Sequence, residues 1–415
     1  MHYSTKEYKC CELIWPGKKT AVQTVDNPTK KRLVPVKKDS VDWDYTCNLY
    51  IEGDNLDALK LLRQDYLNKV KLVYIDPPYN TGKDFIYNDE RLHSDWLNMM
   101  YPRLKLTRSL LADDGVIFIS IDDHEIANLR HICDEIFGSS NFVAQIIWER
   151  AYAPVSLKKH FSTNHDYILV YAKQIENLVC NGLERSAEVN RRYKNPDNDP
   201  RGPWQSDNLT VGPAVSEKCY PITTPAGKKI YPPNGRCWLY TKKRFEEMVK
   251  DNRIWFGRDG NNVPREKRFL SEVKQRVTPK TIWTYKEVGH SQGAKQELKK
   301  LFGGATCFDY PKPLGLILRI LELYSQSDSI VLDFFSGSAS TAHAVMAQNA
   351  KDNGNRQYIM VQIPELTSKN SSAYRGGFSN ICEIGKARIK RAAKLIQAET
   401  GADIDYGVKV FRIVD

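Results

Sequence analysis

The sequence predicts an α/β fold with a largely parallel sheet, interrupted by a basic insert. Short β-branched apolar runs alternate with segments of helical periodicity, which is the pattern of strand–helix–strand units. This alternation stops near residue 150 and resumes near residue 306. We therefore expect residues 41–150 and 306–415 to form one domain, residues 151–305 to be inserted into it, and residues 1–40 to be an N-terminal extension.

The first half of the predicted domain alternates between strands and helices. Strands are expected at residues 49–51, 70–75 and 116–121, and helices at residues 56–66, 96–111 and 126–136. Asp54 or Asn55 can cap the first helix, a turn is expected at residues 113–115, and Gly138 ends the last helix. The strand runs are apolar throughout, which is typical of strands buried in a parallel sheet.

The second half repeats this alternation. Helices are expected at residues 314–323, 342–347 and 381–398, and strands at residues 330–332 and 358–362. The last helix is basic and amphipathic. The two halves together supply the strands and covering helices of a single α/β domain.

Positive charge is concentrated in the predicted insert. The 415 residues carry a formal net charge of +11. Residues 151–305 hold 28 Lys and Arg against 16 Asp and Glu, whereas residues 1–150 have a net charge of −3 and residues 306–415 one of +2. A basic segment indicates either a polyanion such as nucleic acid or a solvated basic face. The candidate phosphate contacts are Arg191, Arg192, Lys242, Lys243 and Arg244.

The remaining composition narrows the class of protein. Hydrophobic residues make up 41% of the chain, which argues against wholesale disorder. Apolar runs are too short for a membrane span, and the N-terminus lacks the apolar core of a signal peptide. The nine cysteines form no C-x-x-C pair, so neither a zinc site nor a disulfide framework is indicated. We expect a cytoplasmic protein that does not enter a membrane.

The first loop whose side chains could bind a ligand or take part in a reaction is Tyr-Ile-Asp-Pro-Pro-Tyr-Asn at residues 74–80. It follows a predicted strand, and ligands of open α/β sheets bind at the carboxyl ends of strands. Pro77 and Pro78 fix the backbone and remove two N–H donors. Asp76 and the Pro77 carbonyl can accept both hydrogens of an exocyclic amine, while Tyr79 stacks on the ring that bears it. The alternative is a proline-rich turn with a capping Asp and a core Tyr.

The second loop, residues 333–341, follows the strand at 330–332 and precedes a helix. A tight turn of small residues between strand and helix can bind a nucleotide-like cofactor through backbone N–H groups. Glu365, just past the strand at 358–362, can hold ribose hydroxyls. Neither a P-loop string nor G-x-G-x-x-G occurs, so a P-loop ATPase and a dinucleotide oxidoreductase are not supported.

Taken together, the two loops resemble those of the amino-methyltransferases that use S-adenosylmethionine, specifically the DNA adenine-N6 group. The amine loop precedes the cofactor loop here, which is the permuted order called the β class. The strings that carry a closer resemblance, to the modification subunit of type III restriction–modification systems, lie at residues 49–62, 73–85, 94–111, 115–125, 281–302 and 308–345.

The resemblance implies a Rossmann-like, circularly permuted methyltransferase fold in which residues 151–305 form a DNA target-recognition domain. Residues 41–150 would then be the catalytic half and residues 306–415 the cofactor-binding half. It also implies roles for individual side chains. The implied catalytic residues are Asp76, Pro77, Pro78 and Tyr79, and the implied cofactor contacts are Asp54, Asp76, Lys312, Asp333, Phe335, Ser336, Gly337, Ser338, Thr341 and Glu365. No metal is required. A helix cap remains the alternative role for Asp54, and a surface lysine remains the alternative for Lys312.

The resemblance further implies methyl transfer to the N6 amine of an adenine flipped out of double-stranded DNA, by a homodimer that can associate with a restriction subunit. Methylation of cytosine N4 or of RNA adenine, and a catalytically silent DNA-specificity subunit, remain alternatives. Two departures from the family stand out: Ala339 replaces the second glycine of the cofactor turn, and the chain ends at Asp415, before the C-terminal partner-binding region of type III subunits. We expect alanine at position 339 to be tolerated. The end at Asp415 is expected to mean either that the chain is truncated or that it is a shorter relative of the type III subunits.

Overall fold

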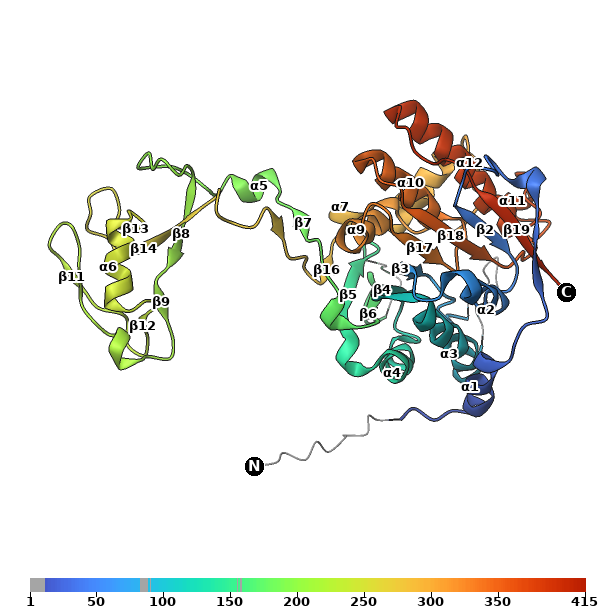
Figure 1. Ribbon diagram of the computed structural model, residues 1–415, viewed down its shortest axis with the longest axis horizontal. Helices are drawn as coiled ribbons and strands as arrows, with labels where there is room; N and C mark the ends of the chain where they lie inside the picture. Colours follow the sequence, from blue (N-terminus) through green and yellow to red (C-terminus); the bar gives the residue numbers. More distant parts are fainter. Residues whose placement is uncertain (1–11, 83–88, 90, 155, 157–158) are drawn as a thin grey trace. The chain divides into compact units, whose positions relative to one another are not determined.

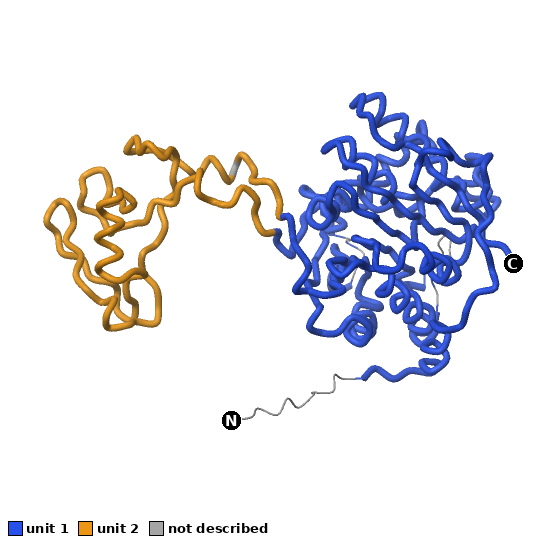
Figure 2. The backbone as a smooth tube through the Cα atoms, viewed as in Figure 1, with its two compact units in different colours: residues 1–181, 279–415 blue, residues 182–278 orange. Residues whose placement is uncertain are grey.

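The structure is a computed structural model that describes residues 12–82, 89, 91–154, 156 and 159–415 (Figure 1). The chain divides into two compact units, which Figure 2 colours separately. Unit 1 comprises Met1–Asn181 and Pro279–Asp415, and unit 2 comprises Gly182–Thr278. Unit 1 contains both predicted loops. Among the described residues, the structure contains no helix with the length and apolar character needed to cross a membrane.

Unit 1 is built on a ten-stranded sheet of order β1-β19-β2-β18-β17-β3-β4-β6-β5-β16. The strands are β1 (Arg32–Pro35), β2 (Leu49–Glu52), β3 (Val70–Ile75), β4 (Leu111–Ile121), β5 (Phe142–Glu149), β6 (His165–Ala172), β16 (Ile282–Trp283), β17 (Ile330–Asp333), β18 (Gln357–Gln362) and β19 (Lys409–Val414). The strands from β19 to β4 pair in parallel. All six residues of β3 are buried, as expected for a strand covered on both faces.

Helices pack on both faces of this sheet (Figure 1). They are α1 (Lys18–Asp26), α2 (Asn55–Tyr66), α3 (His93–Leu110), α4 (Ile126–Phe137), α7 (Tyr285–Val288), α8 (Ser291–Leu301), α9 (Leu314–Tyr324), α10 (Ser340–Asp352), α11 (Ser372–Arg375) and α12 (Ile381–Thr400). Side chains alternate along a strand, so Val73 and Ile75 join the core beneath α2, α3 and α4. On the other face, Phe118 packs against Tyr324 of α9 with ring centres 5.5 Å apart.

The predicted strands and helices of both halves are present, with small shifts at their ends. One local prediction was wrong: residues 113–115 do not form a separate turn but lie inside β4. Val70 pairs with Leu111 and Leu72 with Val116, so residues 112–115 bulge opposite Lys71. The Lys71 ammonium binds Asp114 across this bulge.

The predicted boundaries of the insert were too wide. Residues 142–149 and 165–172 form β5 and β6, which extend the main sheet beyond β4, and residues 282–301 return to unit 1 as β16, α7 and α8. The described part of residues 1–40 belongs to unit 1 as well, because β1 pairs with β19. Residues 1–11, and residues 83–85 of the matched string 73–85, lie outside the described residues.

Unit 2 consists of short strands around a small apolar core. Its elements are β7 (Leu183–Glu184), α5 (Ala187–Asn190), β8 (Trp204–Asn208), β9 (Thr210–Val211), β10 (Ile222–Thr223), β11 (Lys229–Ile230), β12 (Cys237–Trp238), α6 (Lys242–Lys250), β13 (Ile254–Trp255), β14 (Arg265–Phe269) and β15 (Arg276–Val277). Trp238, Phe245 and Met248 lie in the core. The unit holds 20 Lys and Arg against 12 Asp and Glu, so it keeps most of the excess positive charge.

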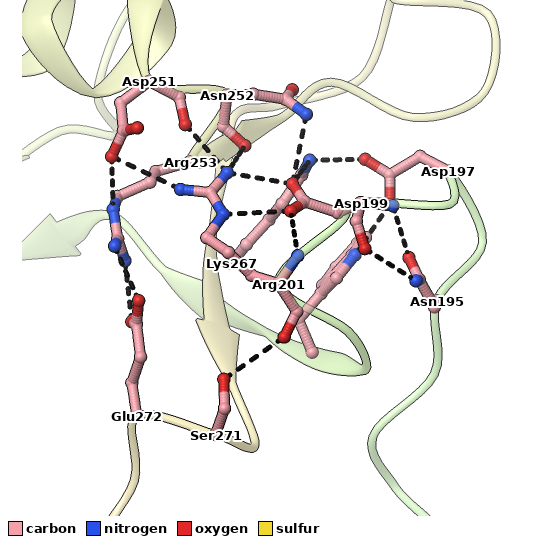
Figure 3. A network of polar contacts seen from close by, with 11 residues as sticks. Asn195, Asp197, Asp199, Arg201, Asp251, Asn252, Arg253, Lys267, Ser271 and Glu272 are labelled. Atoms are coloured by element: carbon pink, nitrogen blue, oxygen red, sulfur yellow. Dashed lines mark hydrogen bonds and ion pairs between the residues drawn. The ribbon is translucent and has the colours of Figure 1, made fainter.

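A network of ion pairs holds β8, β14 and the loops beside them together (Figure 3). The Lys267 side chain is fully buried and binds the carboxylates of Asp197 and Asp199. Arg201 binds Asp199 at 2.9 Å and holds the pKa of that carboxyl well below its usual range. Arg253 binds Glu272 at 2.7 Å. These three cations are therefore engaged inside the unit.

The buried lysine gives a stability prediction. Lys267→Met removes the cation shared by the buried Asp199, which keeps Arg201, and by the partly exposed Asp197, so we expect the free energy of unfolding of unit 2 to fall, by at most about 3–5 kcal/mol. Urea unfolding followed by tryptophan fluorescence measures this, because Trp204 and Trp255 lie 5.5 and 6.0 Å from the ammonium. Lys250→Met, on the exposed end of α6, is the control. Equal unfolding midpoints for the two variants would contradict the assigned role.

Candidate active site

The two predicted loops meet in one cavity of unit 1. The amine loop follows β3 and the second loop follows β17, and these two strands are hydrogen-bonded neighbours. The cavity has a volume of about 300 Å³. Its walls include every residue predicted to contact the cofactor: Asp54, Asp76, Lys312, Asp333, Phe335, Ser336, Gly337, Ser338, Thr341 and Glu365. Pro78 of the amine loop also lines it, whereas the buried Pro77 and the half-buried Tyr79 are not among its lining residues.

The amine loop is fixed by hydrogen bonds from three directions. The indole N–H of Trp96, on α3, donates to the Pro78 carbonyl at 2.8 Å. Asn80 adopts a left-handed backbone (φ +64°), and its backbone N–H donates to Asp89 at 2.9 Å. The Asn80 side-chain amide donates to the buried Glu125 at 2.7 Å. Such a loop presents its carboxylate in one orientation, which is what positioning of a reacting group requires.

Asp76 is ion-paired with Lys312. The ammonium of Lys312 lies 2.5 Å from Oδ2 of Asp76 and 5.0 Å from the centre of the Tyr79 ring. The other carboxylate oxygen, Oδ1, is buried and has no hydrogen-bond partner among the described residues. Lys312 is thus part of the cavity wall, as predicted, and not a surface lysine, but its contact is with the carboxylate of the amine loop.

Tyr79 offers an aromatic face and a neutral hydroxyl. Burial, and next the charge of Asp76, raise the pKa of Tyr79 well above its usual value, so the phenol stays protonated. Its hydroxyl is buried and forms no hydrogen bond with the described part of the chain. The Lys312 cation lies over the Tyr79 ring.

The second loop turns sharply into α10. The Gly337 N–H donates to the side-chain oxygen of Gln362 at 2.8 Å, and Gly337 has φ +50°. Ala339 caps α10 with φ +60° and ψ +42°, a left-handed conformation that costs a non-glycine residue about 1–2 kcal/mol. The cost of alanine at this position is therefore backbone strain.

Asp333 lies at the end of β17 and is buried. Burial raises the pKa of Asp333 to about 7, although hydrogen bonds from the Thr341 hydroxyl at 2.6 Å and the Phe335 N–H at 3.1 Å oppose the shift. The charge of Asp76 raises this pKa further, and that of Lys312 lowers it. Thr341, predicted as a cofactor contact, therefore also holds the carboxylate beside it.

Asp54 and Glu365 place two more carboxylates on the cavity wall. Asp54 caps α2, accepting from the Leu56 N–H at 2.8 Å, and pairs with Arg103 at 3.1 Å. The helix cap, which was the alternative role, is therefore formed, and the cofactor contact stays a prediction. Oε2 of Glu365 is buried without a hydrogen-bond partner in the described parts of the chain. Burial raises the pKa of Glu365, and the charge of Arg91 lowers it.

Three residues of the site were missed by the sequence analysis. Arg103 of α3 pairs with Asp54, Gln362 holds the Gly337 N–H, and the buried Arg388 of α12 donates to the hydroxyls of Ser338 at 2.9 Å and Ser340 at 2.6 Å. Gln362 is the last residue of a predicted strand, so its position at the ligand edge of the sheet was available as a signal. Arg103 and Arg388 resemble ordinary helix-surface cations in sequence.

The donor set of the cavity fits a nucleoside-like cofactor with a charged amino-acid end. Buried polar atoms normally have hydrogen-bond partners, yet Asp76 Oδ1, Ser336 Oγ and Glu365 Oε2 lack one within the described residues, and all three residues line this cavity. Carboxylates accept hydrogen bonds from hydroxyls and ammonium groups, and the aromatic rings of Phe308 and Phe335 cover apolar parts of a ligand. The described ranges contain no cluster of three or more His, Cys, Asp and Glu side chains that could hold a metal ion.

The predicted phosphate contacts lie on unit 2. Arg191 and Arg192 follow α5, while Lys242, Lys243 and Arg244 form the first turn of α6, and all five side chains are exposed. Arg244 forms a surface ion pair with Glu247 at 3.1 Å. Figure 1 shows α5 and α6 well apart within the unit. They are therefore two separate basic positions.

The raised pKa of Asp333 predicts a pH-dependent stability. Between about pH 4 and pH 7 the folded chain binds a proton at Asp333 that the unfolded chain has released, so this group makes the fold less stable as the pH rises through that range. Asp333→Asn should remove this dependence and be more stable than the wild type at pH 8, by on the order of 1–3 kcal/mol. Urea unfolding at pH 5 and pH 8 measures the difference, with Asp309→Asn as the exposed control. An unchanged pH dependence would contradict the assignment.

The chain is similar in sequence to known DNA-modifying proteins. The family model described as DNA methylase matches residues 70–390. The StyLTI Mod subunit, a type III restriction–modification enzyme of Salmonella typhimurium, is 38% identical over 88% of this chain and 60% of its own length. The EcoPI Mod subunit of Escherichia phage P1 is 34% identical over 97% of this chain and 71% of its own length.

The chain thus spans about 60–70% of the length of these two type III relatives. Among solved structures, that of TTHA0409 from Thermus thermophilus, complexed with S-adenosyl-L-methionine, has a TM-score of 0.41 at 14% identity and covers 89% of this chain and 100% of that one. The family match and the phage relative establish that the chain belongs to the DNA methylase family, together with the modification subunits of type III restriction–modification enzymes.

Proposed function

We propose that this chain transfers the methyl group of S-adenosylmethionine to the N6 amine of an adenine rotated out of double-stranded DNA. The observation that carries this proposal is the shared cavity, in which an acceptor carboxylate at the end of β3 faces a turn at the end of β17. An amine acceptor and a nucleoside-like ligand are therefore brought to one place.

Several residues of the wall suit parts of the cofactor. Glu365, with its unpartnered Oε2, would accept hydrogen bonds from ribose hydroxyls, and Asp54 would contact the adenine ring. Asp333 would meet the amino-acid end, and Phe335 would pack on the cofactor beside the turn formed by Ser336, Gly337 and Ser338. When bound, the cofactor supplies an already activated methyl group, so the protein mainly provides orientation and electrostatics.

The amine loop would then orient the acceptor. The amine lone pair of adenine is delocalised into its ring, which makes it a weak nucleophile. Hydrogen bonds from the amine to Asp76 and to the Pro77 carbonyl favour a pyramidal nitrogen whose lone pair points toward the methyl group. The base must leave the duplex to reach this site, at a cost of a few kcal/mol. Stacking on Tyr79 would return about 1–3 kcal/mol of that cost.

The acidic residue at position 76 favours adenine over cytosine as the acceptor, because the related cytosine-N4 enzymes usually carry Ser there. We propose that unit 2 recognises DNA through its exposed cations, and that the chain works as a homodimer with an optional restriction subunit. In a dimer with twofold symmetry, one copy can read the DNA while the other modifies it.

Loss of the acceptor carboxylate tests the proposed reaction. Asp76→Ala should lower methyl transfer to DNA at least about 100-fold, because the amine loses the acceptor that orients it, while the cofactor keeps its other contacts. Tritium transfer from labelled cofactor measures the rate, and calorimetric binding of S-adenosylhomocysteine checks the cofactor site. Asp309→Ala, which removes an exposed partner of Lys295, is the control. Unchanged turnover in Asp76→Ala would refute the role of this carboxylate.

The DNA-binding role of unit 2 predicts a change in salt dependence. Replacing Lys242, Lys243 and Arg244 by Gln should reduce the slope of log K against log salt concentration by about 0.9 for each phosphate that is no longer neutralised. Fluorescence anisotropy with a labelled duplex measures this slope. The matched control replaces three exposed lysines of unit 1, at positions 19, 69 and 105, by Gln. A slope that changes only in the control would assign DNA binding elsewhere.

A further inference from the structure

The ion pair between Lys312 and Asp76 divides the acceptor carboxylate into two unlike oxygens. Oδ2 is held by the Lys312 ammonium at 2.5 Å. Oδ1 is buried and lacks a hydrogen-bond partner among the residues that the structure describes. The neighbouring Tyr79 hydroxyl is also buried and lies close to Asp76, but no hydrogen bond of normal geometry joins it to this oxygen. One oxygen is thus engaged by the protein, and the other is available to a donor that enters the cavity.

We propose that Lys312 is a positioning residue that holds Oδ2 of Asp76 and so makes Oδ1 the atom that accepts the target amine. This inference rests on the methyl transfer proposed above and adds which oxygen of Asp76 accepts the amine and which residue holds that carboxylate in place. An amine with two hydrogens then donates one to Oδ1 and the other to the Pro77 carbonyl. Rotation of the carboxylate, which would offer either oxygen, is prevented by the ammonium.

The charges around Lys312 support a role beyond orientation. Three carboxylates converge near it from three strands: Asp76 after β3, Asp333 at the end of β17, and Asp166 at the start of β6. Burial raises the pKa of Asp166 to about 6, Arg150 at 2.8 Å and Lys312 lower it, and Asp122 and Asp76 raise it. Lys312 likewise lowers the pKa of Asp333. The ammonium therefore opposes the rise in pKa that burial causes at Asp166 and Asp333.

The other charged and titratable groups at this edge do not replace Lys312. Arg150 is paired with Asp166, and the charge of Arg91 acts on Glu365. Tyr74 and Tyr79 stay neutral, because burial raises the pKa of both phenols well above the usual value. The ammonium of Lys312 is thus the cation that pairs directly with the acceptor carboxylate of Asp76.

A different role for Lys312 makes the opposite prediction. The resemblance to the family places this lysine at the amino-acid end of the cofactor, where an ammonium would bind the cofactor carboxylate. Removing it would then weaken cofactor binding and leave the acidic side of the pH–rate profile in place. If Lys312 serves Asp76, removal should instead move the acidic side of the profile and spare the cofactor.

Lys312→Met and Lys312→Arg separate these roles, with Lys295→Met as a matched control that removes an exposed Lys–Asp pair. For Lys312→Met we expect methyl transfer at pH 7 to fall on the order of 10–100-fold, with its acidic limb moved to higher pH. The affinity for S-adenosylhomocysteine should change less than about threefold, a difference too small to account for the lost rate. Lys312→Arg should restore the position of the acidic limb, because it keeps the charge.

A titration that does not depend on activity completes the test. Carbon-13 NMR of chains labelled at the aspartate carboxyl carbon, assigned with Asp333→Asn, should show a higher pKa for Asp333 in Lys312→Met than in the wild type. An unmoved titration and acidic limb, together with a loss of S-adenosylhomocysteine affinity, would overturn the proposal. Lys312→Gln replaces Met if that variant does not fold. A wild-type chain that methylates no DNA would refute the proposed function, while the titration would still decide the role of Lys312.

Discussion

The parallel pairing of β3 with β17 is the contact on which the site depends. Val331 pairs with Leu72 and Leu332 with Val73, which joins segments that lie far apart in the chain. Because parallel strands end at the same edge of a sheet, this pairing sets the amine loop beside the cofactor turn. The permuted order of the two loops follows from the same pairing. The amine loop comes first in the chain because β3 precedes β17, yet the two strands are neighbours in the sheet.

The edge so formed concentrates acidic groups in a poorly solvated space. Asp333 and Asp166 both have raised pKa values because burial penalises their charged forms. Folding tolerates them because hydroxyl and backbone donors and two cations, Lys312 and Arg150, partly replace the lost water. The strained backbone of Ala339 adds a further local cost. Such local costs in folding free energy are common at binding and catalytic sites, where the surrounding structure holds residues in unfavourable conformations that suit the ligand.

The two loops were predicted from the sequence because both are local signals at strand ends, and the residues that the family resemblance assigns to the cofactor all line one cavity. The ion pair of Lys312 with Asp76 was not predicted, because it depends on the pairing of strands that are distant in sequence. The predicted boundaries of the insert were also too wide. Strand β6 belongs to the main sheet only through its antiparallel pairing with β4, and the polar residues around it hid that relation.

Membership of the DNA methylase family and the geometry of the cavity lead to one chemical claim, that an adenine amine is the acceptor. Mass spectrometry of nucleosides from duplex DNA, after incubation with the chain and methyl-labelled S-adenosylmethionine, tests it most directly. The account predicts label in N6-methyldeoxyadenosine and none in cytosine. Label in N4-methyldeoxycytidine, or DNA that stays unlabelled although the chain binds both DNA and cofactor, would contradict it.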